Sequence, residues 1–308
     1  MINKAHLAGI GFATLFGFSF LFSKIALSHL SPMGLIAYRF LIAFLVFELL
    51  RRLKIIHIRF QKSTWKDWLL VAIFQPIFYF IFETYGLNRT SSGEAGMMIA
   101  LIPIFVTLMG AFILKEKPKP IQYFFILLSV SGIIFIQVAK PGTIESFETI
   151  GVILLFLAVI SAALYNIASR NASKRLKPYE ITYFMMLVGA VVFNIFYVIE
   201  LLLHQSLSTY ILNFTNPQLI LPILYLGIVA SIGGFFMMNY ALSKMPAHVS
   251  SIYSNLSTIV ALIAGALILK ESLAWYHYLG GIMIITGVYG TVRMNQTNVN
   301  KKQETNSE

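Results

Sequence analysis

Long apolar runs fill most of this chain and limit what it can fold into. A helix needs about 20 apolar residues to cross a bilayer. Runs of roughly that length lie at residues 7–27, 33–50, 68–87, 93–114, 121–139, 149–169, 179–203, 218–242, 249–269 and 275–292. Hydrophobic residues make up 58% of the chain and charged residues 11%, against roughly 45–50% and 25% in soluble domains. We therefore predict an all-α integral membrane protein with ten transmembrane helices. This excludes a cytosolic enzyme, a disordered regulator and, because cysteine is absent, a secreted disulfide scaffold.

The distribution of Lys and Arg predicts how these helices are oriented. With the N-terminus inside, 18 of the 23 Lys and Arg residues fall in inner segments. The outer segments hold Arg89, Lys140 and Lys270, and the spans themselves hold Lys24 and Arg39. This positive-inside pattern predicts that both termini are cytoplasmic. Because the basic residues form short clusters between apolar runs, we interpret the net charge of +11 as a topology signal and expect no nucleic-acid partner.

An internal repeat relates the two halves of the chain. Residues 110–116 (GAFILKE) and 265–271 (GALILKE) match at six of seven positions, and the same offset of 155 pairs Gly132 with Gly287. The offset also pairs Leu87 with Leu242, and an earlier offset of 146 places Lys24 opposite Arg170.

The repeat predicts an inverted architecture. Residues 1–140 and 141–293 each hold five predicted spans, and the polar tail 294–308 is predicted to be disordered. Because five is odd, the second copy starts on the opposite side of the membrane, so the halves are related by a pseudo-two-fold axis in the membrane plane. Secondary transporters are commonly built this way, with the substrate site near the midplane. The alternative is a duplication that only stabilises a membrane scaffold.

Several motifs resemble the EamA-type branch of the drug/metabolite transporter superfamily. They are Arg39 in the second span (YRFLIAF), the G-A-x-x-L-K-E that ends the fourth span of each half, and the central glycine of each fifth span. The resemblance implies a ten-helix carrier of the plasma membrane that exports amino acids, other metabolites or drugs. It also implies that spans one, three, four, six, eight and nine line the cavity, with spans five and ten behind them. Phe16-Gly17 stands where the family usually has Trp-Gly, which leaves the substrate open.

Polar side chains at helical spacing predict which faces line a pocket. On span three, Gln75, Tyr79 and Glu83 share one face at i, i+4 and i+8. The other candidate substrate-binding residues are Tyr165 and Asn166 on span six, Asn239 and Tyr240 on span eight, and Asn255 and Thr258 on span nine. Polar groups that face lipid would be unpaired, which favours a pocket. Helix packing is the alternative for such faces.

Four charged residues fall near the outer ends of their predicted spans: Lys24, Arg39, Glu83 and Glu94. Charge at membrane depth is costly unless it is paired or hydrated, so we expect these groups to pair and to serve in coupling or gating. Glu83 could carry a proton, Lys24 or Arg39 could hold a substrate carboxylate, or the four could form a structural ion pair. Glu116 and Glu271 lie at span ends beside lysines, and we interpret them as helix caps and loop anchors.

Enzymatic motifs are missing from the sequence. There is no phosphate-binding loop, and the six histidines lack metal-ligand spacing. We therefore expect no catalytic residues, no metal and no cofactor. The predicted function is a secondary transporter, an exporter driven by the proton gradient or by the solute's own gradient, whose partners are a small solute and the lipid bilayer. An uncoupled facilitator and a non-transporting scaffold are the alternatives, and homodimerisation is left open.

Overall fold

The computed structural model describes residues 4–58, 62–89, 98–99, 101–116, 118–139, 149–204, 206–268 and 274–304, and throughout these ranges the regular elements are helical. In chain order they are α1 (Lys4–Leu27), α2 (Pro32–Arg52), η1 (Lys62–Thr64), α3 (Trp65–Ala72), η2 (Ile73–Phe78), α4 (Tyr79–Arg89), α6 (Ile102–Met109), η3 (Gly110–Leu114), α7 (Pro120–Ala139), α8 (Thr149–Ala172), α9 (Pro178–His204), α10 (Ser208–Phe214), α11 (Pro217–Leu224), η4 (Tyr225–Gly234), α12 (Phe235–Lys244), α13 (Ala247–Ser251), α14 (Tyr253–Ile268) and α15 (Trp275–Glu304).

Many of these helices are built to lie in lipid. Six helical segments of the described chain are long and apolar enough to cross a membrane: Lys4–Leu27, Pro32–Arg52, Trp65–Arg89, Ile150–Ala172, Pro178–His204 and Pro217–Lys244. Large apolar side chains such as Phe112 and Leu203 are exposed, at 84% and 71% of their surface. So much exposed apolar surface is unfavourable in water and suits a bilayer. The prediction of an all-α, multi-pass membrane protein is therefore confirmed.

Capping residues followed by proline begin two of the helices. Ser31 Oγ accepts a hydrogen bond from the Gly34 amide at 3.1 Å, directly before Pro32. Asn216 caps α11 in the same way, before Pro217. A polar cap satisfies one of the free amides of the first turn, and proline is favoured there because it has no amide to satisfy.

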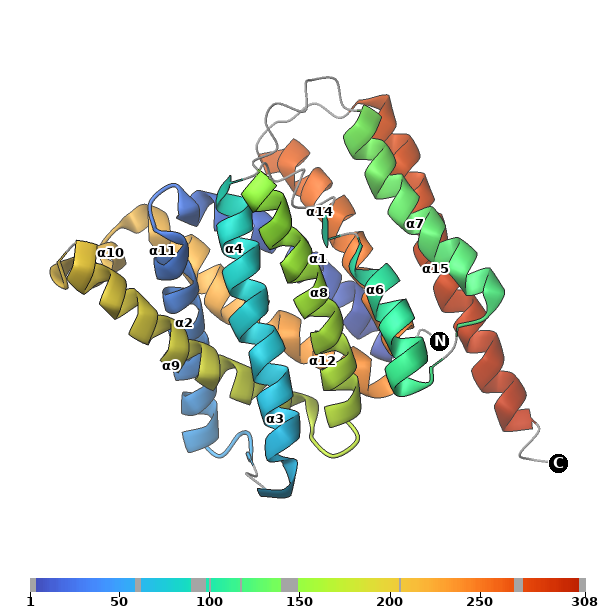
Figure 1. The fold of residues 1–308 in the computed structure, drawn as a ribbon, viewed down its shortest axis with the longest axis horizontal. Helices are drawn as coiled ribbons and strands as arrows, with labels where there is room; N and C mark the ends of the chain where they lie inside the picture. The colour runs from blue at the N-terminus through green and yellow to red at the C-terminus, as the bar shows by residue number, and fades with distance from the viewer. Residues whose placement is uncertain are drawn as a thin grey trace.

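Helices α7 and α15 pack along each other on one side of the bundle (Figure 1). Glycines allow their backbones to approach closely. A Cβ atom added to Gly132 would lie 2.7 Å from the carbonyl oxygen of Gly280, and one added to Gly287 would lie 2.6 Å from the carbonyl oxygen of Phe125. Elsewhere α1 packs on α14, α2 on α9, and α4 on α8. Of these helices, α1, α2, α4, α8 and α14 line the central cavity described below.

Helix α15 extends into the C-terminal tail. It continues past Arg293 to Glu304, and the disorder expected for residues 294–308 stays a prediction. The residues beyond Arg293 contain no proline or glycine, and lysine, glutamine and glutamate favour helix, so nothing in this segment stops the preceding helix. The last four residues, 305–308, lie outside the described range.

Candidate functional site

A central cavity contains about 680 Å³ of empty space, including the part open to solvent. Both halves of the chain contribute to its walls. The lining residues are Phe12, Phe16, Ser19, Phe20, Arg39, Gln75, Tyr79, Phe80, Glu83, Ile99, Ile102, Ala162, Asn166, Phe235, Met238, Ser251, Ser254 and Ser257. They come from α1, α2, the α3–η2–α4 segment, α6 and the residues before it, α8, α12, α13 and α14. A mostly apolar wall with a few convergent polar groups is typical of sites that bind small solutes.

Two opposite charges share this cavity. Arg39 on α2 and Glu83 on α4 are both buried, with 6% and 8% of their surface exposed. Arg39 Nε donates to Ser231 Oγ at 2.8 Å, and its guanidinium carbon lies 4.6 Å from the centre of the Phe80 ring. One carboxylate oxygen of Glu83 accepts a hydrogen bond from the Thr84 hydroxyl at 3.1 Å. Each charge is therefore held in place by its own partners.

Arg39 and Glu83 do not form a direct ion pair. No nitrogen of the guanidinium lies within 4.0 Å of a Glu83 carboxylate oxygen. The two groups attract each other electrostatically across the cavity. The direct pairing expected for these two residues is therefore absent, and the cation and the anion of the cavity wall lie more than 4.0 Å apart.

Aromatic rings from both halves form the apolar part of the cavity wall. Phe16 on α1 and Phe235 on α12 have their ring centres 5.0 Å apart, and Phe80 lies 6.0 Å from Phe235. Phe12 packs against Phe16 at 5.8 Å. These tilted or edge-on rings stabilise one another and present a surface suited to an apolar or aromatic group.

A break in the helix positions Gln75. Residues Ile73–Phe78 form a π-helix that contains Pro76, and Gln75 has non-helical backbone angles, φ −150° and ψ 118°. Proline removes a backbone donor and disrupts regular α-helical geometry. The Gln75 side chain is buried at the cavity, and its Oε1 accepts no hydrogen bond from any residue that the structure describes.

Asn166 on α8 presents a second amide to the cavity. Its Nδ2 donates to the carbonyl oxygen of Ala162 at 2.8 Å. Its Oδ1 is buried and has no hydrogen-bond partner within the described chain. Because the carbonyl oxygen of Ala162 holds the amide nitrogen, the amide oxygen is the atom that can accept a hydrogen bond from a solute.

The other predicted binding residues lie elsewhere. Asn239 is fully buried in a network in which its Oδ1 accepts from Tyr165 at 2.6 Å and from Ser169 at 2.7 Å, while its Nδ2 donates to Thr182 at 3.0 Å. This network joins α8, α9 and α12 and leaves the Asn239 amide fully satisfied. The structure therefore places Tyr165 and Asn239 in helix packing and not at the cavity wall.

Three further candidates also lie away from the cavity. Asn255 Nδ2 donates to Ser129 Oγ at 3.0 Å, which ties α14 to α7. Tyr240 and Thr258 are half-buried and do not line the cavity. Of the nine predicted binding residues, the cavity brings together Gln75, Tyr79, Glu83 and Asn166.

Of the two remaining charged candidates, one can be placed. Lys24 Nζ donates to the carbonyl oxygen of Leu87 at 2.9 Å, which connects the end of α1 to the end of α4. Glu94 lies outside the described residues.

Sequence reasoning missed most of the aromatic wall and the serines. Ser251, Ser254 and Ser257 recur at every third residue on one face of the α13–α14 region, and that spacing is a signal that could have found them. The phenylalanines gave no such signal, because a phenylalanine on a transmembrane helix faces lipid as readily as a cavity.

A cluster that we call the Glu116 clasp joins three helices at one end of the bundle. Glu116 Oε1 accepts from Arg170 Nε at 2.7 Å, and its Oε2 accepts from the Ala247 amide at 2.8 Å. Arg170 Nη1 also donates to the carbonyl oxygen of Leu242 at 2.9 Å. Glu116 therefore binds the first amide of α13 and ties the residues after η3 to α8 and α12.

His248 lies beside this clasp, in the segment between α12 and α14. Both of its ring nitrogens are buried and have no hydrogen-bond partner in the described part of the chain. Burial lowers the pKa of His248 to about 4, against an attraction from Glu116 and together with a repulsion from Arg170. The imidazole is therefore neutral at physiological pH.

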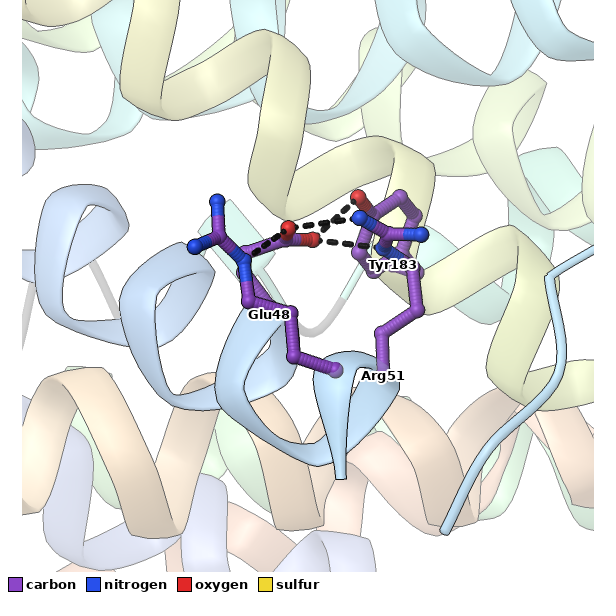
Figure 2. A network of polar contacts seen from close by, with 4 residues as sticks. Glu48, Arg51 and Tyr183 are labelled. Carbon is purple, nitrogen blue, oxygen red and sulfur yellow. Dashed lines mark hydrogen bonds and ion pairs between the residues drawn. The ribbon is translucent and has the colours of Figure 1, made fainter. Parts of the chain in front are cut away.

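A second polar network ties α2 to α9 (Figure 2). Glu48 accepts from Arg51 Nη2 at 2.6 Å, from Arg52 Nε at 2.8 Å and from the Tyr183 hydroxyl at 2.9 Å. Figure 2 shows Arg51 and Tyr183 turned toward the Glu48 carboxylate. These contacts fix the end of α2 where the chain enters its basic segment.

Comparisons with known proteins support a transporter. An uncharacterized transporter of Bacillus subtilis, YcxC, is 38% identical over 98% of this chain and 95% of its own. A probable amino-acid metabolite efflux pump of Escherichia coli is 24% identical over 94% and 95% of the two chains. A crystal structure that is 17% identical superposes with a TM-score of 0.75 over 94% of this chain and 96% of the other, which shows that the two folds are alike. The EamA-like transporter family matches residues 3–138 and 149–293. The resemblance inferred from the sequence is therefore confirmed: this multi-pass membrane protein belongs to the EamA-like transporter family.

Proposed function

We propose that this protein is a plasma-membrane secondary transporter that exports small amphipathic metabolites, in particular apolar or aromatic amino acids, by alternating access. The observation that carries this proposal is the separation of Arg39 and Glu83 across one aromatic-lined cavity. Buried charges of opposite sign that do not touch leave room for a solute that bears both signs.

An amino-acid zwitterion fits this arrangement. Its carboxylate would bind the guanidinium of Arg39, and its ammonium group would bind the carboxylate of Glu83. Charge-assisted hydrogen bonds of this kind are the strong ones in a low-dielectric site. The phenylalanine rings would receive the side chain, which favours apolar and aromatic amino acids. The name of the Escherichia coli relative agrees with this substrate class.

Ten transmembrane helices in two inverted halves form the second part of the proposal, with both termini cytoplasmic. The family match to each half supports it. So do the reciprocal contacts of α7 and α15: Gly132 faces the Gly280 carbonyl, and Gly287 faces the Phe125 carbonyl. The offset of 155 converts each contact into the other, as a pseudo-two-fold axis between the helices requires.

In the proposed alternating-access mechanism, the Glu116 clasp is the gate that opens and closes. By the predicted topology it lies at the cytoplasmic end, where it would be formed while the cavity faces outward and broken while it faces inward. Glu83 would couple this movement to the proton gradient by binding a proton in one of the two states. A homodimer remains a prediction and plays no part in this mechanism.

Transport by the purified protein in liposomes tests the proposal. Labelled phenylalanine and leucine are loaded inside, and efflux is followed with and without an imposed pH difference. Efflux that the pH difference accelerates, and that loses this acceleration in Glu83→Gln, is the expected result. Glu200→Gln on α9 is the matched control, because it removes a glutamate that does not line the cavity.

The other outcomes are equally informative. Efflux that does not respond to pH contradicts proton coupling and leaves an uncoupled facilitator. Absence of amino-acid efflux, with the protein folded and inserted, contradicts the proposed function.

A further inference from the structure

Two amide oxygens at the cavity lack hydrogen-bond partners, so a solute that binds there should supply hydrogen-bond donors. Gln75 Oε1 and Asn166 Oδ1 are both buried, and neither has a hydrogen-bond partner in the described part of the chain. Buried polar atoms in folded proteins are nearly always hydrogen-bonded. Two unpaired acceptors at one cavity, one from each half of the chain, therefore indicate that a ligand supplies the missing donors.

Most hydrogen-bond donors of the cavity wall already bond to other atoms of the protein. Four serine hydroxyls donate to carbonyl oxygens of their own helical segments: Ser19 to Phe16, Ser251 to His248, Ser254 to Ser251, and Ser257 to Ser254. Arg39 Nε donates to Ser231. The remaining donors are the Gln75 side-chain nitrogen, the Tyr79 hydroxyl and the terminal nitrogens of Arg39, the last of which the proposed function assigns to a carboxylate. Three acceptor groups are left for the solute: Glu83, Gln75 and Asn166.

We propose that Gln75, Asn166 and Glu83 form a site for a primary ammonium group, and that this site makes the transporter select unsubstituted amines over N-alkylated ones. The inference rests on the proposed amino-acid transport and goes further by naming the atoms that recognise the amine. A primary ammonium group carries three N–H donors, one for each acceptor. Each N-methyl group removes a donor and leaves one buried acceptor unpaired.

The amide nitrogen of Asn166 makes the assignment specific. Because Nδ2 is held by the Ala162 carbonyl, the side chain cannot rotate to offer its nitrogen to a solute without losing that bond. Asn166 therefore acts as an acceptor alone. On α9, Asn194 makes the same bond from Nδ2 to the carbonyl oxygen four residues earlier, at 2.7 Å, but its Oδ1 accepts from the Tyr210 hydroxyl. Asn194 lies away from the cavity and so provides a matched control.

The experiment measures efflux of L-phenylalanine, N-methyl-L-phenylalanine and N,N,N-trimethyl-L-phenylalanine from liposomes that contain the full-length protein. We expect efflux to fall roughly tenfold for one methyl group and more for three, since each lost hydrogen bond to a buried acceptor costs about a factor of ten. Asn166→Leu and Gln75→Leu should each reduce this preference toward equal transport. Asn166→Asp, which keeps the acceptor, should retain it, and Asn194→Leu should leave the ratio unchanged.

A binding measurement guards against variants that fold poorly. Each detergent-purified variant is checked by size exclusion, and the rise of its melting temperature with each of the three solutes is recorded. The ratio between solutes within one variant does not depend on how much of that variant is active.

The outcomes separate this inference from the proposed function. Phenylalanine transported as well as its methylated analogues would overturn the ammonium site and leave amino-acid transport standing. Preference for the trimethylated cation would also overturn it, and would assign recognition to the aromatic rings through cation–π contacts. If wild-type protein neither binds nor moves phenylalanine, the proposed function fails and the ammonium site fails with it.

Discussion

Lys24 and Arg170 make the same contact at opposite ends of the molecule. Lys24 Nζ donates to the carbonyl oxygen of Leu87, and Arg170 Nη1 donates to the carbonyl oxygen of Leu242, both at 2.9 Å. The repeat offsets relate Lys24 to Arg170 and Leu87 to Leu242. Each cation joins the end of the first helix of its half to the end of the third.

The two contacts are far apart because α4 and α8 run in opposite directions. A Cβ atom added to Gly86, near the end of α4, would lie 3.2 Å from the carbonyl oxygen of Gly151, near the start of α8. Arg170 is 19 residues further along α8, which is about 28 Å at the helical rise. Each copy of the repeat therefore provides one such contact between a cation and a carbonyl oxygen, and the two contacts lie at opposite ends of the bundle.

Breaking the Glu116 clasp should open the end of the cavity that it closes. In Glu116→Gln the charge pairing with Arg170 is lost, at a cost of roughly 1 kcal/mol for a partly buried pair, so the population of the open form should rise about fivefold. The chain has no cysteine, so Ser254→Cys provides a single label site at the cavity wall. Labelling of this cysteine by an impermeant maleimide from the clasp side should become several times faster.

A charge-swapped pair provides the control for the clasp. Glu116→Arg combined with Arg170→Glu should slow labelling again only in part, since it re-forms the ion pair but loses the hydrogen bonds to the Ala247 amide and the Leu242 carbonyl. Unchanged labelling in Glu116→Gln would contradict a gating role for the clasp.

The close packing of α7 and α15 predicts where added volume is harmful. A Cβ atom at Gly287 would lie 2.6 Å from the Phe125 carbonyl oxygen and 2.6 Å from Ser129 Cβ. Gly287→Ala should therefore lower the free energy of unfolding by roughly 1–3 kcal/mol. Gly281→Ala, on the same helix, should be harmless, because nothing lies within 4 Å of its added Cβ. Thermal unfolding in detergent measures both, and equal melting temperatures would contradict the packing argument.

The sequence predicted the membrane architecture better than it predicted the site. Apolar length identifies the membrane-spanning helices, because bilayer thickness leaves a direct mark in a sequence. Asn166 and Asn239 carry no such mark: each is an asparagine within an apolar stretch of helix. One presents a free oxygen to the cavity, while the other is satisfied by three neighbours. Only the packing of the other helices decides which asparagine faces the cavity and which is hydrogen-bonded inside the bundle.

Regular spacing was also an incomplete guide on the third span. The i, i+4, i+8 relation assumes an unbroken α-helix through Gln75, Tyr79 and Glu83. The structure has a π-helical segment there with non-helical angles at Gln75, yet all three residues still line the cavity. Pro76 was the sequence signal for that break.

Asn239 should matter for stability and not for selectivity. In Asn239→Leu the hydroxyls of Tyr165, Ser169 and Thr182 lose their shared partner inside the bundle. Leaving buried polar groups unpaired should cost roughly 2–4 kcal/mol, seen as a lower melting temperature. The ratio of phenylalanine to N-methylphenylalanine transport should stay unchanged in liposomes that hold equal amounts of folded protein. A changed ratio would move Asn239 into the binding site.

Stability should fall with acidity because of His248. Burial lowers its pKa to about 4, below the ordinary value of 6.5, so between these values the unfolded chain binds a proton that the folded chain excludes. Stability is therefore complete above about pH 6.5 and is lost progressively as the pH falls toward 4, by up to roughly 3 kcal/mol. Melting temperatures measured at pH 7.5 and pH 5 should differ less in His248→Leu than in the wild type. Glu116→Gln separates the contribution of the neighbouring carboxylate, since His248 should keep its acid sensitivity in that variant. An equal loss of stability in His248→Leu and the wild type would show that other groups cause the acid sensitivity.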